Sequence, residues 1–182
     1  MHPADIPVLE TARLRLRALR LEDFAAFAAM WSDPQVVRFV GGVPLARDEA
    51  WSRFLRQMGM WHYLGFGTFA IEKKDSGAFL GACGFHDLFR NITPSLEGTM
   101  EAGWALPPAA QGQGIAEEAM RAALAWADRV HARMRKTCII RPCNAASLHV
   151  AAKLGFAEYA RADFDGGPII LLERGVTARD PD

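Results

Sequence analysis

The sequence predicts a mixed α/β (α+β) fold with a mostly antiparallel sheet of about seven strands and about four helices. Two observations predict it. Stretches with apolar residues at every second position, typical of strands, are separated by stretches with apolar residues three or four apart, typical of helices. Their order along the chain is β, α, α, a run of strands, then α, β, α, β, β. With 182 residues, 51% of them apolar, we expect one domain over residues 1–182 with its core at about 9–175.

Five elements are predicted in the first half of the chain. They are a strand, two helices and a two-stranded hairpin, over residues 13–19, 21–31, 46–61, 68–72 and 78–85. In the first strand leucines alternate with arginines, so the two types face opposite sides of the sheet. Ser32-Asp33-Pro34 ends the first helix, because proline lacks the amide donor that a helix interior needs. The apolar stripe expected along the second helix consists of Trp51, Phe54, Leu55 and Met58.

The second half contains the remaining strands and two more helices. The strand Met100–Leu106 ends at two prolines, and an alanine-rich helix follows over Gly114–His131. Next come a strand at residues 137–140 and a helix that Asn144 is expected to cap, ending at Gly155. Two final strands, residues 157–164 and 168–173, flank an Asp-Gly-Gly turn and predict a closing hairpin.

Charge and composition exclude several classes of protein. Lysine and arginine together number 21, as do aspartate and glutamate, so no overall positive charge favours nucleic acid or an anionic membrane as a partner. The start of the chain lacks the pattern of a signal peptide, and no apolar run is long enough to span a membrane. We expect a cytoplasmic protein, either a monomer or a homodimer.

The three cysteines carry little functional signal. Cys83, Cys138 and Cys143 are odd in number and show no CxxC spacing, so they are expected to be reduced thiols. No histidine and cysteine cluster has the spacing of metal ligands, so we expect a reaction without a metal.

A glycine-containing loop lies between the strand that ends at Leu106 and the helix that begins near Gly114. The first amides of a helix have no intrahelical acceptor, and the helix dipole adds positive charge there, so such a loop attracts anions. The spacing is wrong for a P-loop, and Glu117 stands where a dinucleotide fingerprint needs glycine or alanine. The pattern that fits is Gln-x-x-Gly-x-Ala, with Gln111, Gly114 and Ala116.

Three further stretches complete a recognisable set: residues 9–17 (LETARLRLR), residues 101–106 (EAGWAL), and Asn144-Ala145-Ala146-Ser147 with Lys153-Leu154-Gly155-Phe156. Together with the loop, they make the sequence resemble the GNAT superfamily of N-acetyltransferases over nearly the whole chain, and most closely its RimJ/RimL-type branch. The resemblance implies a sheet splayed open between its fourth and fifth strands, and acetyl-coenzyme A as co-substrate.

The resemblance also implies where the coenzyme binds. The amides of Trp104, Ala105 and Leu106 would pair with its pantetheine arm. Asn144 would contact the coenzyme as well as cap its helix. The residues expected to hold the pyrophosphate are Gln111, Gly112, Gln113, Gly114, Ile115 and Ala116.

Acetyl transfer needs a proton or other stabilisation for the departing thiolate. Many GNAT enzymes supply a tyrosine seven residues after the motif asparagine, and that position here is Ala151. Ser147 lies one turn earlier on the same helix face, and RimL-like enzymes are thought to use a serine there. The structural alternative is that Ser147, as the third residue of the helix, only satisfies a helix-end group.

Glu101 is the best candidate for a general base, because its strand carries the coenzyme. The alternatives for Glu101 are an anchor for the substrate ammonium group or a core ion pair. His86 and Asp163 are reserve candidates. Four aromatic residues are either acceptor-pocket or packing residues: Trp31, Trp61, Tyr63 and Phe66.

The function expected from the sequence is an acetyl-CoA-dependent N-acetyltransferase. Its acceptor would be a peptide or protein N-terminus or a small primary amine, and fold similarity cannot choose between them. The alternative is a coenzyme A-binding regulatory or interaction module without turnover, which the missing tyrosine at position 151 keeps open. A nucleotide-binding protein has little support without a P-loop or Rossmann signature.

Overall fold

A computed structural model describes residues 6–175, so both ends of the expected 1–182 domain, residues 1–5 and 176–182, lie outside the described part. The strands are β1 Leu9–Glu10, β2 Leu14–Ala18, β3 Thr68–Lys73, β4 Phe79–His86, β5 Met100–Ala105, β6 Lys136–Ile140, β7 Phe156–Phe164 and β8 Gly167–Arg174. The helices are α1 Phe24–Trp31, α2 Pro34–Val37, α3 Arg47–Leu64, α4 Ile115–Val130 and α5 Ala145–Lys153, with short 3-10 turns at Leu21–Asp23 and Pro108–Ala110.

The strands form one mixed sheet in the order β1-β2-β3-β4-β5-β6-β8-β7. Every neighbouring pair is antiparallel except β5 and β6, which run parallel. The mostly antiparallel α/β fold is therefore confirmed. The described chain has one strand more than expected, because the two-residue β1 pairs with β2 but is too short to show alternation.

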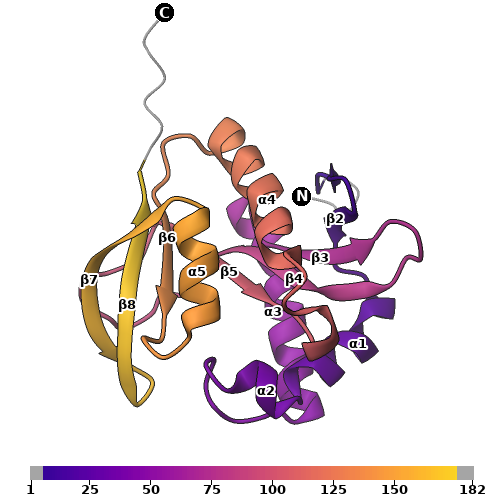
Figure 1. Ribbon diagram of the computed structural model, residues 1–182, viewed down its shortest axis with the longest axis horizontal. Helices are drawn as coiled ribbons and strands as arrows, with labels where there is room; N and C mark the ends of the chain where they lie inside the picture. Colours follow the sequence, from indigo (N-terminus) through magenta and orange to yellow (C-terminus); the bar gives the residue numbers. More distant parts are fainter. Residues whose placement is uncertain (1–5, 176–182) are drawn as a thin grey trace, which may run out of the picture.

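Helices cover both faces of the sheet, with α4 and α5 on the near side in Figure 1 and α3 passing behind. Strand β3 divides its side chains accordingly. Phe69 and Ile71 belong to the core cluster beneath α4, whereas Ala70 belongs to the cluster formed with α1, α2 and α3. Because successive side chains of a strand point to opposite faces of the sheet, β3 contributes residues to the hydrophobic cores on both faces.

The far end of the sheet repeats this arrangement. In β8, Leu172 belongs to the core that includes α5, and Leu171 packs on the opposite face against Ile92 and Leu96. Residues 87–99, which connect β4 to β5, therefore cover the face of the β6-β8-β7 region that lies away from α5.

Two helix predictions need correction. Asp33 and Pro34 end α1 but also begin α2, because the Asp33 carboxylate accepts the Gln35 amide at 2.8 Å and proline suits a first helical position. In α3, Trp51 and Leu55 of the expected stripe are exposed, and the helix buries a neighbouring face instead. The buried residues of α3 are Ala50, Phe54, Gln57, Met60 and Trp61.

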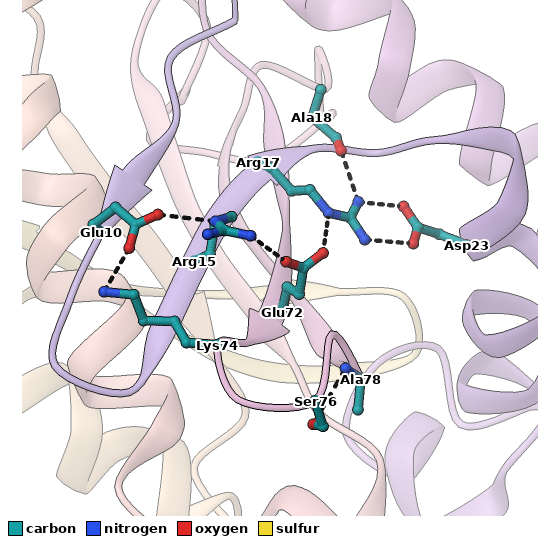
Figure 2. A network of polar contacts seen from close by, with 9 residues as sticks. All are labelled: Glu10, Arg15, Arg17, Ala18, Asp23, Glu72, Lys74, Ser76 and Ala78. Atoms are coloured by element: carbon teal, nitrogen blue, oxygen red, sulfur yellow. Dashed lines mark hydrogen bonds and ion pairs between the residues drawn. The ribbon is translucent and has the colours of Figure 1, made fainter.

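A chain of ion pairs ties the edge of the sheet to the segment before α1, as Figure 2 shows. The buried Arg17 guanidinium donates to Asp23 at 2.7 and 2.9 Å and to Glu72 at 2.6 Å. Arg15 extends the chain from Glu72 to Glu10. The Arg17 guanidinium holds the pKa of the Glu72 carboxyl below its usual range. Each buried charge in this chain of ion pairs, on Arg17, Asp23 and Glu72, therefore has a partner of opposite charge.

The sheet opens between β5 and β6. These strands pair only at Met100 with Lys136 and at Glu101 with Thr137, although both continue for several residues beyond. Pro107 and the short turn after it then lead the chain away from the sheet. In the order expected from the sequence, these are the fourth and fifth strands, so the predicted opening is confirmed.

Candidate active site

A cavity of about 1010 Å³ lies at the opening between β5 and β6. Its lining comes from both faces of the sheet: Asn144 and Ser147 at the start of α5, and Arg53 and Gln57 on α3. It therefore has one side next to the predicted coenzyme residues and another side formed by α1, α2 and α3. Five sequence-predicted site residues line it: Glu101, Trp104, Ala105, Asn144 and Ser147.

The remaining predicted coenzyme residues lie together just past the end of β5. Gly112 and Gly114 have φ of +72° and +74°, a conformation that favours glycine. The first hydrogen bond of α4 runs from the Glu118 amide to the Gly114 carbonyl at 3.0 Å. The amides of residues 115–117 precede that bond and so have no acceptor within the helix. The helix terminus with free amides that the sequence predicts is therefore present, and anion binding there stays a prediction.

Side chains hold this loop in shape. The Gln111 amide group donates to the Leu106 carbonyl at 2.9 Å, and that of Gln113 donates to the Ala109 carbonyl at 2.7 Å. The Arg13 guanidinium donates twice to the Gln113 carbonyl, at 3.1 Å each. The two glutamines of the motif therefore stabilise the loop through hydrogen bonds to nearby carbonyls, and Arg13 stabilises it from a distant part of the chain.

Arg13 was not predicted as a site residue. Its guanidinium also pairs with Glu118 at 2.6 Å, and the Thr11 hydroxyl donates to the same carboxylate at 2.6 Å. The residues Thr11-Ala12-Arg13 thus attach the first strand to the start of α4. The sequence shows that Thr11 and Arg13 belong to the motif LETARLRLR. It does not show that both contact Glu118, about 100 residues further along the chain.

Ser147, at the start of α5, lines the cavity and has a hydroxyl without a hydrogen bond to the described part of the chain. The Asn144 side chain accepts the Ser147 backbone amide at 3.1 Å, so Asn144 is the N-cap, as predicted. This contact uses the Ser147 backbone only. Among residues 6–175, no group forms a hydrogen bond with the Ser147 hydroxyl, which lines the cavity. Ala151, in the position of the usual tyrosine, is completely buried in the core.

Glu101 is buried and bonded to Arg90. The Arg90 guanidinium donates to its two carboxylate oxygens at 2.8 and 2.9 Å, and Arg90 also lies over the Phe164 ring. This is the ion pair that the sequence left open as an alternative to a general base. Both oxygens keep further lone pairs for a ligand, since an ionised carboxylate has about four acceptor sites.

Of the two reserve candidates, only His86 lines the cavity. Its Nε2 lies 3.0 Å from the Thr68 hydroxyl. Burial, together with the nearby Arg53 and Arg90 guanidiniums, lowers the pKa of His86 to about 4, so its ring is neutral at pH 7. Asp163 is exposed on β7 and lies outside the cavity lining.

The four candidate aromatic residues divide between the two roles. Trp31 and Tyr63 line the cavity, whereas Trp61 and Phe66 pack in the core under α4. The Trp61 indole donates to the Thr68 carbonyl at 2.9 Å, so its polar group already has a partner within the fold.

Comparison with known proteins identifies the family of the chain. A family model described as an acetyltransferase (GNAT) domain matches residues 13–157. The match begins at Arg13, which holds the loop, and extends past α5. The chain belongs to the GNAT acetyltransferase family. As a GNAT protein it is an acyltransferase.

Relatives span nearly the full length of this GNAT chain. It is 30% identical to the uncharacterized protein YkkB of Bacillus subtilis, over 91% of this chain and 94% of YkkB. A Bordetella pertussis structure described as a GNAT-family acetyltransferase has a TM-score of 0.83 and 36% identity, covering 93% of this chain and 99% of that one. RimL, a ribosomal L7/L12 α-N-protein acetyltransferase solved with coenzyme A, has a TM-score of 0.76 at 16% identity, over 95% and 100% of the two chains. At that identity the likeness to RimL is one of fold.

The described part of this GNAT domain has neither a metal-binding cluster nor a membrane-spanning helix. Within residues 6–175, no three His, Cys, Asp or Glu side chains are grouped so as to hold a metal ion. None of the helices in the same part of the chain combines the length and apolar character needed to cross a membrane.

Proposed function

We propose that this GNAT chain is an acetyl-CoA-dependent N-acetyltransferase whose acceptor is a primary amine, on a peptide or protein N-terminus or on a small molecule. The observation that carries the proposal is the open edge of β5 beyond Glu101, which leads from the cavity toward the glycine loop before α4. A ligand with amides in its middle and a diphosphate at one end matches these features in order.

The coenzyme would bind along this edge. Residues 102–105 have backbone groups on the β6 side that no strand pairs with, and an extended pantetheine arm can pair with them as a strand does. The pyrophosphate would accept from the free amides at the start of α4, where glycines at 112 and 114 leave room for it. RimL, which shares this fold, has been solved in complex with coenzyme A.

In the proposed reaction the neutral amine attacks the carbonyl carbon of the thioester. A C–N bond forms, the C–S bond breaks, the nitrogen loses a proton and the departing thiolate gains one. The products are an N-acetyl amine and free coenzyme A. Ser147, with its unbonded hydroxyl, would stabilise the thiolate by donating a hydrogen bond or a proton. Asn144 would position Ser147 through the cap contact.

The acceptor must lose its proton before it attacks. Cations near a bound ammonium group favour its neutral form. The environment that lowers the pKa of His86 to about 4 would therefore also lower the pKa of a bound amine. We assign Glu101 the role of hydrogen-bond acceptor for the substrate nitrogen, because its two hydrogen bonds from Arg90 hold the carboxylate in place beside the cavity.

Turnover on a panel of amines tests the proposal. Purified protein is mixed with acetyl-CoA and either small primary amines or peptides with free N-termini, and thiol release and acetylated product are both measured. We expect one thiol per acetyl group transferred. Tight coenzyme A binding without turnover on any acceptor would instead indicate the non-catalytic module. Binding of ATP in preference to coenzyme A would indicate a nucleotide-binding protein.

A further inference from the structure

An unpaired arginine stands on the α3 side of the cavity. The Arg53 guanidinium lies 3.8 Å from the centre of the Trp31 ring and lines the cavity. Within residues 6–175, no carboxylate forms an ion pair with it, and its buried Nε has no hydrogen-bond acceptor. The nearby Glu101 is bound to Arg90 instead. Arg53 is half-buried, and a cation held partly away from water without a nearby anion is uncommon in a folded protein, so a ligand is the natural explanation for it.

Two other unpaired groups accompany Arg53. In the described part of the chain, three buried side-chain polar atoms have no partner: Arg53 Nε, Gln57 Oε1 and Trp31 Nε1. All three residues line the same cavity, and Gln57 lies one helical turn after Arg53. Gln57 is only 5% exposed and Trp31 only 4%. Buried polar groups in native proteins are nearly always paired, so three orphans at one place indicate a missing binding partner.

The chemistry of the orphans defines that partner. Arg53 and Trp31 offer N–H donors, and Gln57 offers a carbonyl acceptor. A guanidinium matches a carboxylate in geometry and can donate two parallel hydrogen bonds to it. The complementary ligand therefore has an anionic oxygen group and an N–H donor close together.

The total charge of the cavity lining indicates how much negative charge the ligand carries. Four arginines line it, at positions 53, 56, 90 and 141, against three carboxylates, at positions 87, 101 and 165. With His86 neutral, one positive charge remains. Burial and the neighbouring Arg56 lower the pKa of Arg53 to about 10, which reflects the lack of a nearby anion. One excess positive charge suits a carboxylate better than a doubly charged phosphate.

We propose that the acceptor of this enzyme is an amine that also bears a carboxylate, and that Arg53, with Gln57 and Trp31, is the subsite that binds the carboxylate end. The inference rests on the proposed acetyl transfer and specifies its substrate class. Arg53 lies on α3 and the pyrophosphate loop precedes α4, so this subsite belongs to the acceptor and not to the coenzyme. Exposed apolar residues also line the cavity, which suits an acceptor with an apolar side chain: Val40, Val43, Tyr63 and Phe89.

A pair of product-like ligands isolates the carboxylate. N-acetyl-leucine and N-acetyl-leucinamide differ in this group, and neither has an amine that titrates. We expect calorimetry in the presence of coenzyme A to give at least tenfold tighter binding of the acid to the wild-type protein. Arg53→Met should bind the two ligands equally, and Arg53→Lys should keep part of the preference. A preference that persists in Arg53→Met would overturn the proposal, and so would equal binding of both ligands by the wild type together with equal turnover of Asp and Asn peptides.

Controls separate this result from general damage. Arg47 lies on the same helix and over the Phe24 ring at 5.0 Å, but outside the cavity, so Arg47→Met should keep the wild-type preference. Arg53→Met removes an unpaired cation, so its melting temperature should equal or exceed that of the wild type. A melting temperature several degrees lower would show that Arg53 is structural.

Turnover measurements then show whether the carboxylate belongs to a free amino acid or to an acidic peptide N-terminus. They also test the carboxylate subsite separately from the acetyl transfer. The wild type is assayed with leucine and leucinamide, and with peptides carrying Asp or Asn as second residue. Preference for leucine indicates a free amino acid, and preference for the Asp peptide indicates an acidic N-terminus. Equal use of acid and amide in both pairs contradicts the subsite but not the transferase. Selective binding without any turnover contradicts the transferase but not the subsite.

Discussion

The Arg13 guanidinium donates to the Gln113 carbonyl from both of its terminal nitrogens, at 3.1 Å each. This contact joins the start of the first long strand to the middle of the proposed pyrophosphate loop. The Arg13 guanidinium binds a carbonyl of the loop, and so it fixes the backbone that leads to the free amides of the first turn of α4. Arg13 would therefore position the loop without contacting the thioester.

Replacing Arg13 should weaken coenzyme binding more than it weakens the fold. We expect Arg13→Met to raise the Kd for coenzyme A by about fivefold to tenfold, equivalent to about 1 kcal/mol for lost hydrogen bonds to one carbonyl. Calorimetry measures this change. Arg15→Met is the matched control, because Arg15 lies only two residues further on, in β2, but pairs with Glu10 and Glu72 instead. An equal loss in both variants would contradict a specific role for Arg13.

Negative charge at position 114 should abolish coenzyme binding. Gly114 has φ of +74°, which aspartate and asparagine tolerate better than most residues, so the pair Gly114→Asp and Gly114→Asn separates charge from backbone strain. We expect the Asp variant to lose detectable binding and the Asn variant to lose about tenfold or less. If both bind coenzyme A equally well, the pyrophosphate does not lie at this helix terminus.

Substitutions at Ser147 and Asn144 should have different effects, because we expect the first to lower turnover and the second to lower stability. Because the cap bond uses the Ser147 backbone, Ser147→Ala keeps it and should leave the melting temperature unchanged. We expect its kcat to fall by about 100-fold or more, as for loss of a proton donor, with a small change in coenzyme affinity. Asn144→Ala should instead destabilise the protein by about 1 kcal/mol. Wild-type kcat in Ser147→Ala would remove the serine from the mechanism.

The ion-pair chain in Figure 2 predicts a large loss of stability when its central residue is removed. Arg17→Met leaves the buried Asp23 carboxylate without its cation and leaves Glu72 with Arg15 alone, and should cost about 3–5 kcal/mol, measured by urea denaturation. The pKa of Glu72 is lowered in the fold, so its stabilisation is complete above about pH 4.5 and is lost at lower pH. Arg17→Met should therefore flatten the acid limb of the stability profile. An exposed arginine variant, Arg129→Met, should leave the profile unchanged.

The lowered pKa of His86 predicts a second effect of pH on the stability of the protein, at milder acidity. Its pKa falls from 6.5 to about 4 on folding, so the unfolded chain binds the proton more readily between these values. The free energy of unfolding should fall as the pH decreases from about 6.5 to about 4, by about 3 kcal/mol in total, and should be unaffected by this group above pH 7. His86→Gln cannot titrate and should lack this slope. Parallel profiles for the two proteins would show that His86 is not neutral in the fold.

Local signals determined much of the fold and part of the site. The glycine loop, the Asn144 cap and the two hairpins depend on residues that are neighbours in sequence, and each lies where the pattern predicts. The opening between β5 and β6 followed from the resemblance carried by four ordered motifs. Such features were predictable because backbone conformation at turns and helix ends is set by a few adjacent residues.

Only the tertiary structure decided which distant residues meet. The expected stripe of α3 contained Trp51 and Leu55, yet the helix is rotated so that Gln57 is buried and Arg53 lies against Trp31. The ion pair between Glu101 and Arg90 also joins separate segments of the chain, and so does the hydrogen bond from Arg13 to the loop. Periodicity indicates that a helix has an apolar face but not its angle about the axis, which packing sets. The sequence alone therefore indicated the coenzyme, while the arrangement of α1 and α3 over the cavity points to the acceptor.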